Sequence, residues 1–211
     1  MIGNSRRNMN LPEDIQSLTT LVLDRIQGSI SVKQALLRND QFHKLVIQSA
    51  LQIVASLRKG GKVLFFGNGG SAADAQHLAA EFTGRYLKER RALPALALHA
   101  NTSSLTAIGN DYGFDLVFAR QMEALGQAGD VAVGISTSGN SPNVLRALEV
   151  ARQKSIFTVA LTGASGGKMK QAADCTICIP SEETPRIQEC HILTGHIICE
   201  IAENLMIEPA K

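Results

Sequence analysis

The sequence predicts an α/β fold, a three-layer doubly wound sandwich around a five-stranded parallel sheet of the flavodoxin-like kind. Runs of consecutive apolar residues alternate with segments of helical periodicity along most of the chain. Strands that are apolar on both faces are typical of parallel sheets covered by helices on both sides. The expected strands are 62–66, 95–99, 130–135, 157–162 and 174–179. The expected helices that separate and follow them are 72–84, 103–109, 114–125, 141–154, 166–172 and 185–206.

Two further helices are expected before the first strand. Apolar residues recur at spacings of three and four from 15 to 26 and again from 42 to 57, and Gly60-Gly61 supplies a stop. A length of 211 residues suits one domain. We expect a single domain in which residues 1–60 form helices for packing and subunit contacts, and residues 61–211 form the sheet core with the final helix.

Composition limits the classes of function. The net charge of +2 is too small to indicate a nucleic-acid or membrane-surface partner. The sequence shows neither a secretory signal nor a run of 18 apolar residues, so a cytoplasmic location with reduced cysteines is expected.

The cysteines are interpreted as packing residues. Cys175 and Cys178 form a C-x-x-C pair, which could belong to a zinc knuckle or a redox site. A buried strand is favoured, because no second pair exists and no helix start follows the first cysteine. Cys190 and Cys199 lie in the apolar final helix and are expected to be buried there.

A glycine-rich loop follows the first expected strand, with the sequence Gly67-Asn-Gly-Gly-Ser71. Its glycines allow the backbone to approach a ligand closely, and Ser71 is expected to cap the next helix. The run also fits a dinucleotide-binding pattern, G-x-G-x-x-A. That alternative needs an acidic residue at the end of the second strand, where this chain has His99-Ala-Asn101.

A hydroxyl-rich loop follows the third expected strand, and its four hydroxyl side chains are Ser136, Thr137, Ser138 and Ser141. Ser141 is expected at the N-cap and Pro142 at the first helical position. Free amides at a helix start, together with hydroxyls, bind phosphate well. An ordinary serine-rich turn is the alternative, but it would need only one or two hydroxyls. Both loops follow strand ends, where ligands bind in doubly wound sheets.

Polar residues on two helices are candidates for chemistry. His77 and Glu81 are four apart and share a helix face, while Gln188, His191 and His196 lie on the final apolar helix. One buried histidine would usually be a packing residue, but the group as a whole is as consistent with a site as with packing. Glu81 could move a proton between two carbons of a sugar phosphate while His196 moves one between the oxygens. His77, Glu81, Gln188 and His196 could equally form a zinc site, and the residues alone leave the presence of metal open.

Several motifs in register resemble those of the sedoheptulose 7-phosphate (phosphoheptose) isomerases of the sugar-isomerase (SIS) family. They are Gly67-Asn-Gly-Gly-Ser71, Glu81-Phe-Thr-Gly-Arg-Tyr86, Gly109-Asn-Asp111, Gly134-Ile-Ser-Thr-Ser-Gly-Asn-Ser141 and Arg186-Ile-Gln-Glu189. The resemblance extends from about residue 40 to 206. It implies an SIS fold, a homotetramer with active sites between subunits, and conversion of sedoheptulose 7-phosphate to D-glycero-D-manno-heptose 7-phosphate. That reaction is the first step toward the ADP-heptose of lipopolysaccharide.

The resemblance also implies a role for each matching residue. Glu81 is the catalytic base and contacts substrate, and His196 is its catalytic partner. The residues that contact phosphate are Ser136, Thr137, Ser138 and Ser141. The residues that contact the sugar are Asn68, Gly69, Gly70, Ser71, Asn110, Asp111 and Gln188. The residues that match the zinc ligands of some members, at one zinc per subunit, are His77, Glu81, Gln188 and His196. His191 lies outside this set and is expected to be structural.

A non-enzymatic SIS protein that binds the bacterial replication initiator is the alternative identity. It shares the phosphate loops but lacks the acid at the position of Glu81 and the histidine at the position of His196. This chain has both residues, which favours an enzyme. Phe82 stands where some isomerases carry a second glutamate, so Glu81 is the only carboxylate expected at that point.

Overall fold

The structure is a computed structural model that describes residues 15–207. All five expected strands form, and they make one sheet in which every neighbouring pair is parallel. The strands are β1 Val63–Gly67, β2 Ala95–Ala97, β3 Val131–Ser136, β4 Phe157–Thr162 and β5 Cys175–Cys178. Their order, β2-β1-β3-β4-β5, confirms the predicted doubly wound, flavodoxin-like sandwich.

The helices follow the expected alternation with two differences. They are α1 Ile15–Leu37, α2 Asp40–Arg58, α3 Gly70–Thr83, α4 Thr102–Tyr112, α5 Val117–Leu125, α6 Pro142–Gln153, α7 Met169–Ala172 and α8 Thr184–Met206. The helix expected over 114–125 divides into a 3₁₀ turn, η1 Phe114–Leu116, and α5. The helix expected over 166–172 shortens to α7, because Gly166 and Gly167 adopt φ values of 76° and 52° that a helix does not allow.

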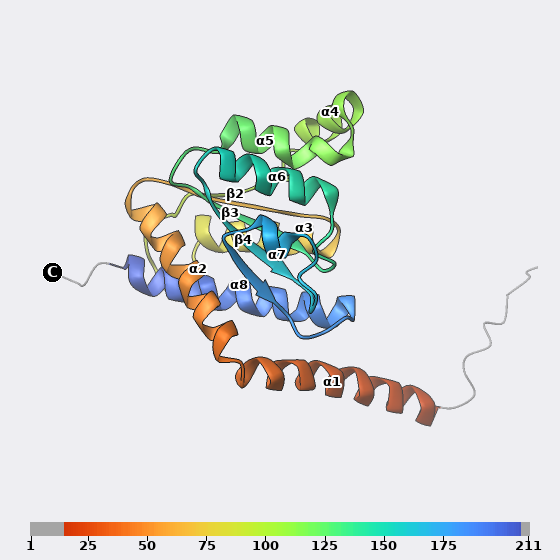
Figure 1. The fold of residues 1–211 in the computed structure, drawn as a ribbon. Helices are drawn as coiled ribbons and strands as arrows, with labels where there is room; N and C mark the ends of the chain where they lie inside the picture. The colour runs from red at the N-terminus through yellow and green to blue at the C-terminus, as the bar shows by residue number, and fades with distance from the viewer. Residues whose placement is uncertain (1–14, 208–211) are drawn as a thin grey trace, which may run out of the picture.

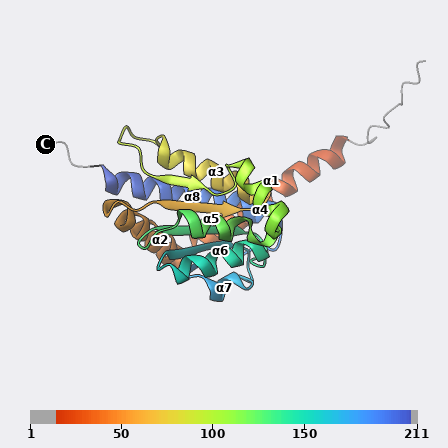
Figure 2. The same cartoon turned by 90° about the horizontal axis from the view of Figure 1, so that it is seen from above.

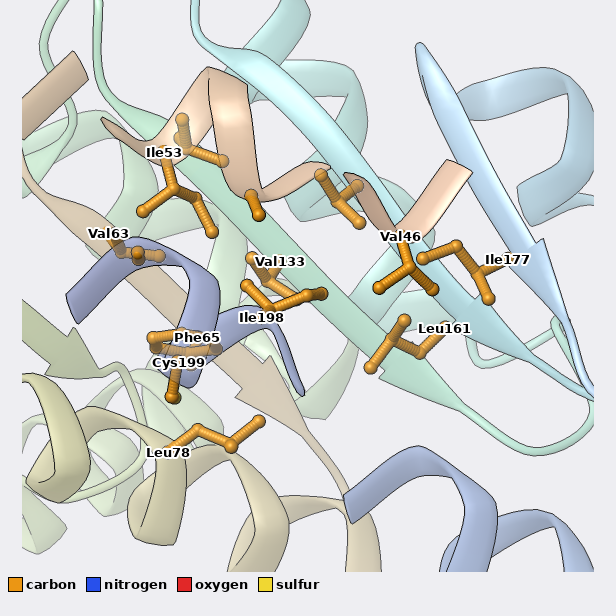
Figure 3. Close-up of a cluster of buried hydrophobic side chains, with 14 of the residues drawn as sticks. Val46, Ile53, Val63, Phe65, Leu78, Val133, Leu161, Ile177, Ile198 and Cys199 are labelled. Carbon is orange, nitrogen blue, oxygen red and sulfur yellow. The ribbon is translucent and has the colours of Figure 1, made fainter. Parts of the chain in front are cut away.

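Side chains of the strands alternate between two cores, one on each face of the sheet. Val63 and Phe65 of β1 face α2, α3 and α8, whereas Leu64 and Phe66 face α5 and α6. Figure 3 shows the first core, to which α2 contributes Ile53 and Val46, and where Ile198 of α8 lies beside Val133 of β3. The three layers are visible in Figure 1, with α5 and α6 on one side of the sheet and α2 and α8 on the other, and Figure 2 shows the same molecule from above.

Helix α1 extends away from this body (Figure 1). It is anchored to the first turns of α8, where Arg25 pairs with Glu183 at 3.5 Å and Arg186 donates a hydrogen bond to the carbonyl oxygen of Arg25. Within the described part of the chain, Leu36 is the only buried side chain of α1. Large apolar side chains along the helix are exposed: Ile15, Leu18, Leu21, Val22, Leu23, Ile26, Ile30 and Leu37. The predicted helix is therefore present, but its apolar face is not covered by the domain.

Cysteine and histidine side chains of α8 pack in the core, where they were predicted to lie. Cys190 and Cys199 are buried on α8 and Cys175 on β5, as expected, whereas Cys178 is only partly buried. His191 is fully buried, and one of its ring nitrogens lies 3.2 Å from the carbonyl oxygen of Thr162 at the end of β4. Burial lowers the pKa of His191 to about 4, so this residue is neutral near pH 7 and has the predicted structural role.

Residues 15–207 contain no helix with the length and apolar character needed to cross a membrane.

Candidate active site

The two ligand-binding loops predicted from the sequence lie side by side. Strands β1 and β3 are neighbours, and Gly67 at the end of β1 pairs with Ile135 near the end of β3. The chain turns tightly here, since a Cβ atom at residue 67 would lie 2.8 Å from the carbonyl oxygen of Ile135 and 2.9 Å from the Cβ of Ser71. Strand order reverses between β1 and β3, and ligands bind at such switch points in open α/β sheets.

A reciprocal amide pair joins the two loops. The side-chain nitrogen of Asn68 donates to Oδ1 of Asn143, and the nitrogen of Asn143 donates back to Oδ1 of Asn68, both at 2.9 Å. Asn143 lies in the first turn of α6 and is only 2% exposed. Asn143 was not among the predicted site residues, although a polar residue directly after a Ser-Pro helix start is a signal that could have indicated it.

The hydroxyl-rich loop is compact. The Oγ of Ser136 lies 2.8 Å from the Oγ of Ser141 and 3.4 Å from that of Ser138. Ser141 occupies the N-cap of α6 and Pro142 its first position, as predicted. In the described structure, Ser141 makes no side-chain hydrogen bond to the first turn of α6, so the first amides stay available. Three of the four hydroxyls thus lie together at the start of α6, an arrangement suited to a phosphate group.

The prediction that Ser71 caps α3 is wrong. Gly69 is the N-cap, with a φ of 55°, and the helix begins at Gly70. Glycine adopts positive φ at little cost, so the chain can enter the helix two residues earlier than a serine cap would allow. Ser71 is instead buried within the first turn.

Three of the predicted chemical groups form one cluster between α3 and α8. The Nε2 atom of His77 lies 3.0 Å from Nε2 of His196 and 3.2 Å from Oε1 of Glu81. The two helices approach closely here, because Gly195 packs directly on Leu78 and a Cβ at residue 195 would lie 2.5 Å from the leucine methyl carbons. Spacing along α3 explains the His77–Glu81 contact, while the contact with His196 depends on tertiary packing.

Electrostatics favour a neutral imidazole at His196. Burial lowers the pKa of His196, the nearby His77 lowers it further, and Glu81 partly opposes both. Because the two Nε2 atoms face each other at hydrogen-bond distance, one of them carries a proton and the other accepts it. The ring centroids of Tyr86 and His196 lie 5.4 Å apart, with the ring planes tilted by 33°.

Other predicted residues lie outside this cluster. The side-chain amide of Gln188 packs against Gly70 at the start of α3, about two helical turns before His77. Asn110 and Asp111 are exposed at the end of α4, where the amide of Asn110 donates to Oδ1 of Asp111 at 2.8 Å. Among residues 15–207, no hydrogen bond or ion pair joins these three side chains to His77, Glu81 or His196.

Asp74 lies one turn before His77 on α3 and was likewise not among the predicted site residues. Burial raises the pKa of Asp74 to about 6, an effect that His77 partly offsets. Its Oδ2 atom is buried and lacks a hydrogen-bond partner among the described residues. Asp74 therefore adds a second carboxyl group to the helix face that carries His77.

The donor atoms of the cluster fit a zinc ion. The imidazole nitrogens of His77 and His196 and a carboxylate oxygen of Glu81 all lie within 4.8 Å of one another. Zinc ligands sit at 2.0–2.2 Å from the metal, so neighbouring ligands on a tetrahedral ion are roughly 3.3 Å apart. The separations of 3.0 and 3.2 Å in the cluster are close to this value. A lowered pKa at His196 also favours the neutral imidazole that binds metal.

Comparison with known proteins gives consistent matches. Residues 31–163 match the family model described as the SIS domain. A phosphoheptose isomerase of Roseiflexus sp. (strain RS-1) is 50% identical over 200 residues, which cover 95% of this chain and 100% of that protein. One from Geobacter sp. (strain M21) is 61% identical over 158 residues, 74% of this chain and 82% of the relative. The solved structure of phosphoheptose isomerase from Neisseria gonorrhoeae matches with a TM-score of 0.83 and 46% identity, covering 89% of this chain and 99% of the other.

The cluster predicts zinc binding that depends on His77. We expect the wild-type protein to bind one Zn²⁺ per chain and His77→Ala to weaken binding by at least about 100-fold, because one of the clustered donors is lost. Competition with a chromogenic chelator measures both affinities. His43→Ala is the matched control, since His43 lies on α2 with its Nε2 3.0 Å from the carbonyl oxygen of Leu36. Equal zinc affinity in wild type and His77→Ala would refute the site.

Proposed function

This chain belongs to the phosphoheptose isomerases of the SIS domain family, and on that basis we propose that it converts sedoheptulose 7-phosphate to D-glycero-D-manno-heptose 7-phosphate. The reaction is an aldose–ketose isomerisation by enediol or enediolate proton transfer, the first step toward the ADP-heptose of lipopolysaccharide. The observation that carries the proposal is the contact of His77 with both Glu81 and His196. These two are the residues that distinguish an enzyme from the initiator-binding relative.

The phosphate of the substrate is held at the start of α6. The hydroxyls of Ser136, Thr137, Ser138 and Ser141 and the first amides of α6 supply donors, and the positive end of the helix dipole favours a dianion. Asn68 and Asn143 tie this loop to the glycine-rich loop, so the sugar contacts at Gly69, Gly70 and Ser71 are fixed relative to the phosphate. Binding of the phosphate therefore orients the carbon backbone of the sugar.

Glu81 and His196 carry out the proton transfers. Glu81 removes the proton from C1 of the ketose and returns it to C2, which converts the ketose to the aldose through one enediol. His196, kept neutral by its lowered pKa, accepts and donates the proton that moves between the two oxygens. The ring of Tyr86 lies beside the His196 ring, with the ring centroids 5.4 Å apart.

We propose that His77, Glu81, Gln188 and His196 hold one zinc ion per subunit. When bound, zinc would polarise the carbonyl of the sugar and stabilise negative charge on oxygen. The clustering of His77, Glu81 and His196 supports this assignment. For Gln188, support comes only from its place on the same helix as His196, since its amide packs at Gly70 in this structure.

We propose a cytoplasmic homotetramer whose active sites are shared between subunits. The exposed apolar side chains of α1 support it, since a row of this length on a soluble domain usually marks a subunit interface. The separation of Gln188, Asn110 and Asp111 from the acid–base cluster in one chain is consistent with a site that a neighbouring subunit completes.

The assembly makes a prediction about α1. Leu21→Glu and Val22→Glu together place two charges among the exposed apolar side chains and should dissociate the tetramer, with loss of most activity. Light scattering measures the assembly. The control is Thr19→Glu, on the same helix, where the native hydroxyl only bonds back to the carbonyl of Ile15. A wild-type protein that is a stable monomer with full activity would refute the shared site.

Removing the charge of Glu81 should abolish turnover without unfolding the protein. For Glu81→Gln we expect kcat to fall by about 10²–10⁴-fold, the usual contribution of a general acid–base group. Substrate binding and the melting temperature should be retained, because the phosphate loop is elsewhere and the backbone carbonyl of residue 81 keeps its hydrogen bond from Arg90. Glu89→Gln, a largely exposed glutamate beyond α3, is the control. Residual activity above about a tenth of wild type would contradict the assignment.

A further inference from the structure

Glu203 is a buried carboxylate on α8, two turns after His196. It accepts hydrogen bonds from three consecutive backbone N–H groups, those of Tyr86 at 2.9 Å and of Leu87 and Lys88 at 2.8 Å. Burial alone would raise its pKa, but the three N–H donors and the charge of Arg90 outweigh burial, and the net pKa lies below the ordinary value. Glu203 is therefore ionised and holds the segment that follows α3.

Arg90 connects Glu203 to the end of α3. Its side chain is only 4% exposed, and its Nε lies 3.2 Å from Oε1 of Glu203, an ion pair in which the N–H does not point at the oxygen. Its two terminal nitrogens donate to the carbonyl oxygens of Glu81 at 2.7 Å and of Phe82 and Gly84 at 3.0 Å. The carbonyls of Glu81 and Phe82 belong to the last turn of α3, where helix carbonyls lack partners from within the helix, and that of Gly84 belongs to its C-cap.

The Arg90 side chain adds to two backbone hydrogen bonds at the end of α3, from Gly84 N–H to the Ala80 carbonyl and from Leu93 N–H to the Phe82 carbonyl, and it reaches the carbonyl of Glu81 itself. The last turn of α3 contains no basic residue of its own, and the C-cap Gly84 has a φ of −85° rather than the left-handed conformation that closes many helices. Glu81 belongs to this turn, so fraying would move its carboxylate relative to His196. The same carboxylate of Glu203 holds the backbone of Tyr86, whose ring lies against His196.

We propose that Arg90 and Glu203 are positioning residues that fix Glu81 and His196 relative to each other. Arg90 fixes the turn that carries Glu81, and Glu203 fixes the segment that places Tyr86 on His196. The expected effect on kcat rests on the proposed function, whereas the positions of Glu81 and His196 do not depend on the substrate. Phosphate binding lies at the other end of α3 and should be unaffected.

A matched pair of variants separates positioning from stability. Glu203→Gln removes the charge of a buried carboxylate that holds three backbone N–H groups. Asp130→Asn likewise removes the charge of a buried carboxylate. Asp130 accepts hydrogen bonds from the backbone N–H groups of Lys62 and Gln127 and from the Lys62 ammonium. It lies at the start of β3, at the end of the strands opposite to the ligand-binding loops. Both variants should lower the melting temperature, since each leaves buried donors without a charged partner.

Only Glu203→Gln should alter the site. We expect kcat to fall at least about 10-fold with KM within about 3-fold, and the affinity for Zn²⁺ alone to fall at least about 10-fold, as for groups that orient metal ligands. Arg90→Lys keeps the positive charge beside Glu203 but loses the guanidinium hydrogen bonds to the carbonyls at the end of α3. It should show an intermediate loss of both kcat and Zn²⁺ affinity. If Glu203→Gln does not fold, the Arg90→Lys variant is compared with Asp130→Asn instead.

The chemical shifts of the His196 ring protons provide a readout without substrate or metal. They should change in Glu203→Gln, as the Tyr86 ring moves, and stay as in wild type in Asp130→Asn. A wild-type protein without turnover would refute the proposed function, yet the zinc and chemical-shift comparisons would still test the positioning role. The inference is overturned if Glu203→Gln and Asp130→Asn are equal in kcat, zinc affinity and His196 shifts.

Discussion

The close packing of α3 on α8 is the contact on which the rest of the site depends. Gly195 lets the two helices approach until Leu78 fills the space that a side chain would occupy. His196 follows directly and reaches His77, a residue 119 positions earlier in the chain. A larger residue at 195 would separate the helices, and the acid–base cluster would separate with them, whatever the local structure of either helix.

The sheet provides the second half of the site by placing two loops at one edge. Parallel strands put their carboxyl ends together, and the neighbouring positions of β1 and β3 bring the glycine-rich loop against the hydroxyl-rich loop. Helix α3 begins at this edge and carries His77 and Glu81 about two to three turns away from it.

Local patterns were enough to predict the five strands, the two loops and the pairing of His77 with Glu81. Each depends on neighbours in sequence: apolar runs, glycine and serine spacing, or one helical turn. Two of the residues that were missed depend on distant partners. Asn143 bonds a residue 75 positions away, and Glu203 bonds the backbone of Tyr86 at a separation of 117. The wrong cap at Ser71 has a different cause, since the positive φ of Gly69 moved the helix start and no side chain signals that choice. The helical pattern of α1 was visible, but the pattern could not show that its apolar face would lie outside the domain.

The most direct test of the function is the conversion of sedoheptulose 7-phosphate by the purified protein in deuterated water, followed by NMR. Proton transfer by Glu81 predicts that D-glycero-D-manno-heptose 7-phosphate forms and that part of it carries solvent deuterium at C2. If no heptose 7-phosphate forms, with or without added zinc, the chain is not the isomerase. A pull-down of the bacterial replication initiator would then be the appropriate experiment.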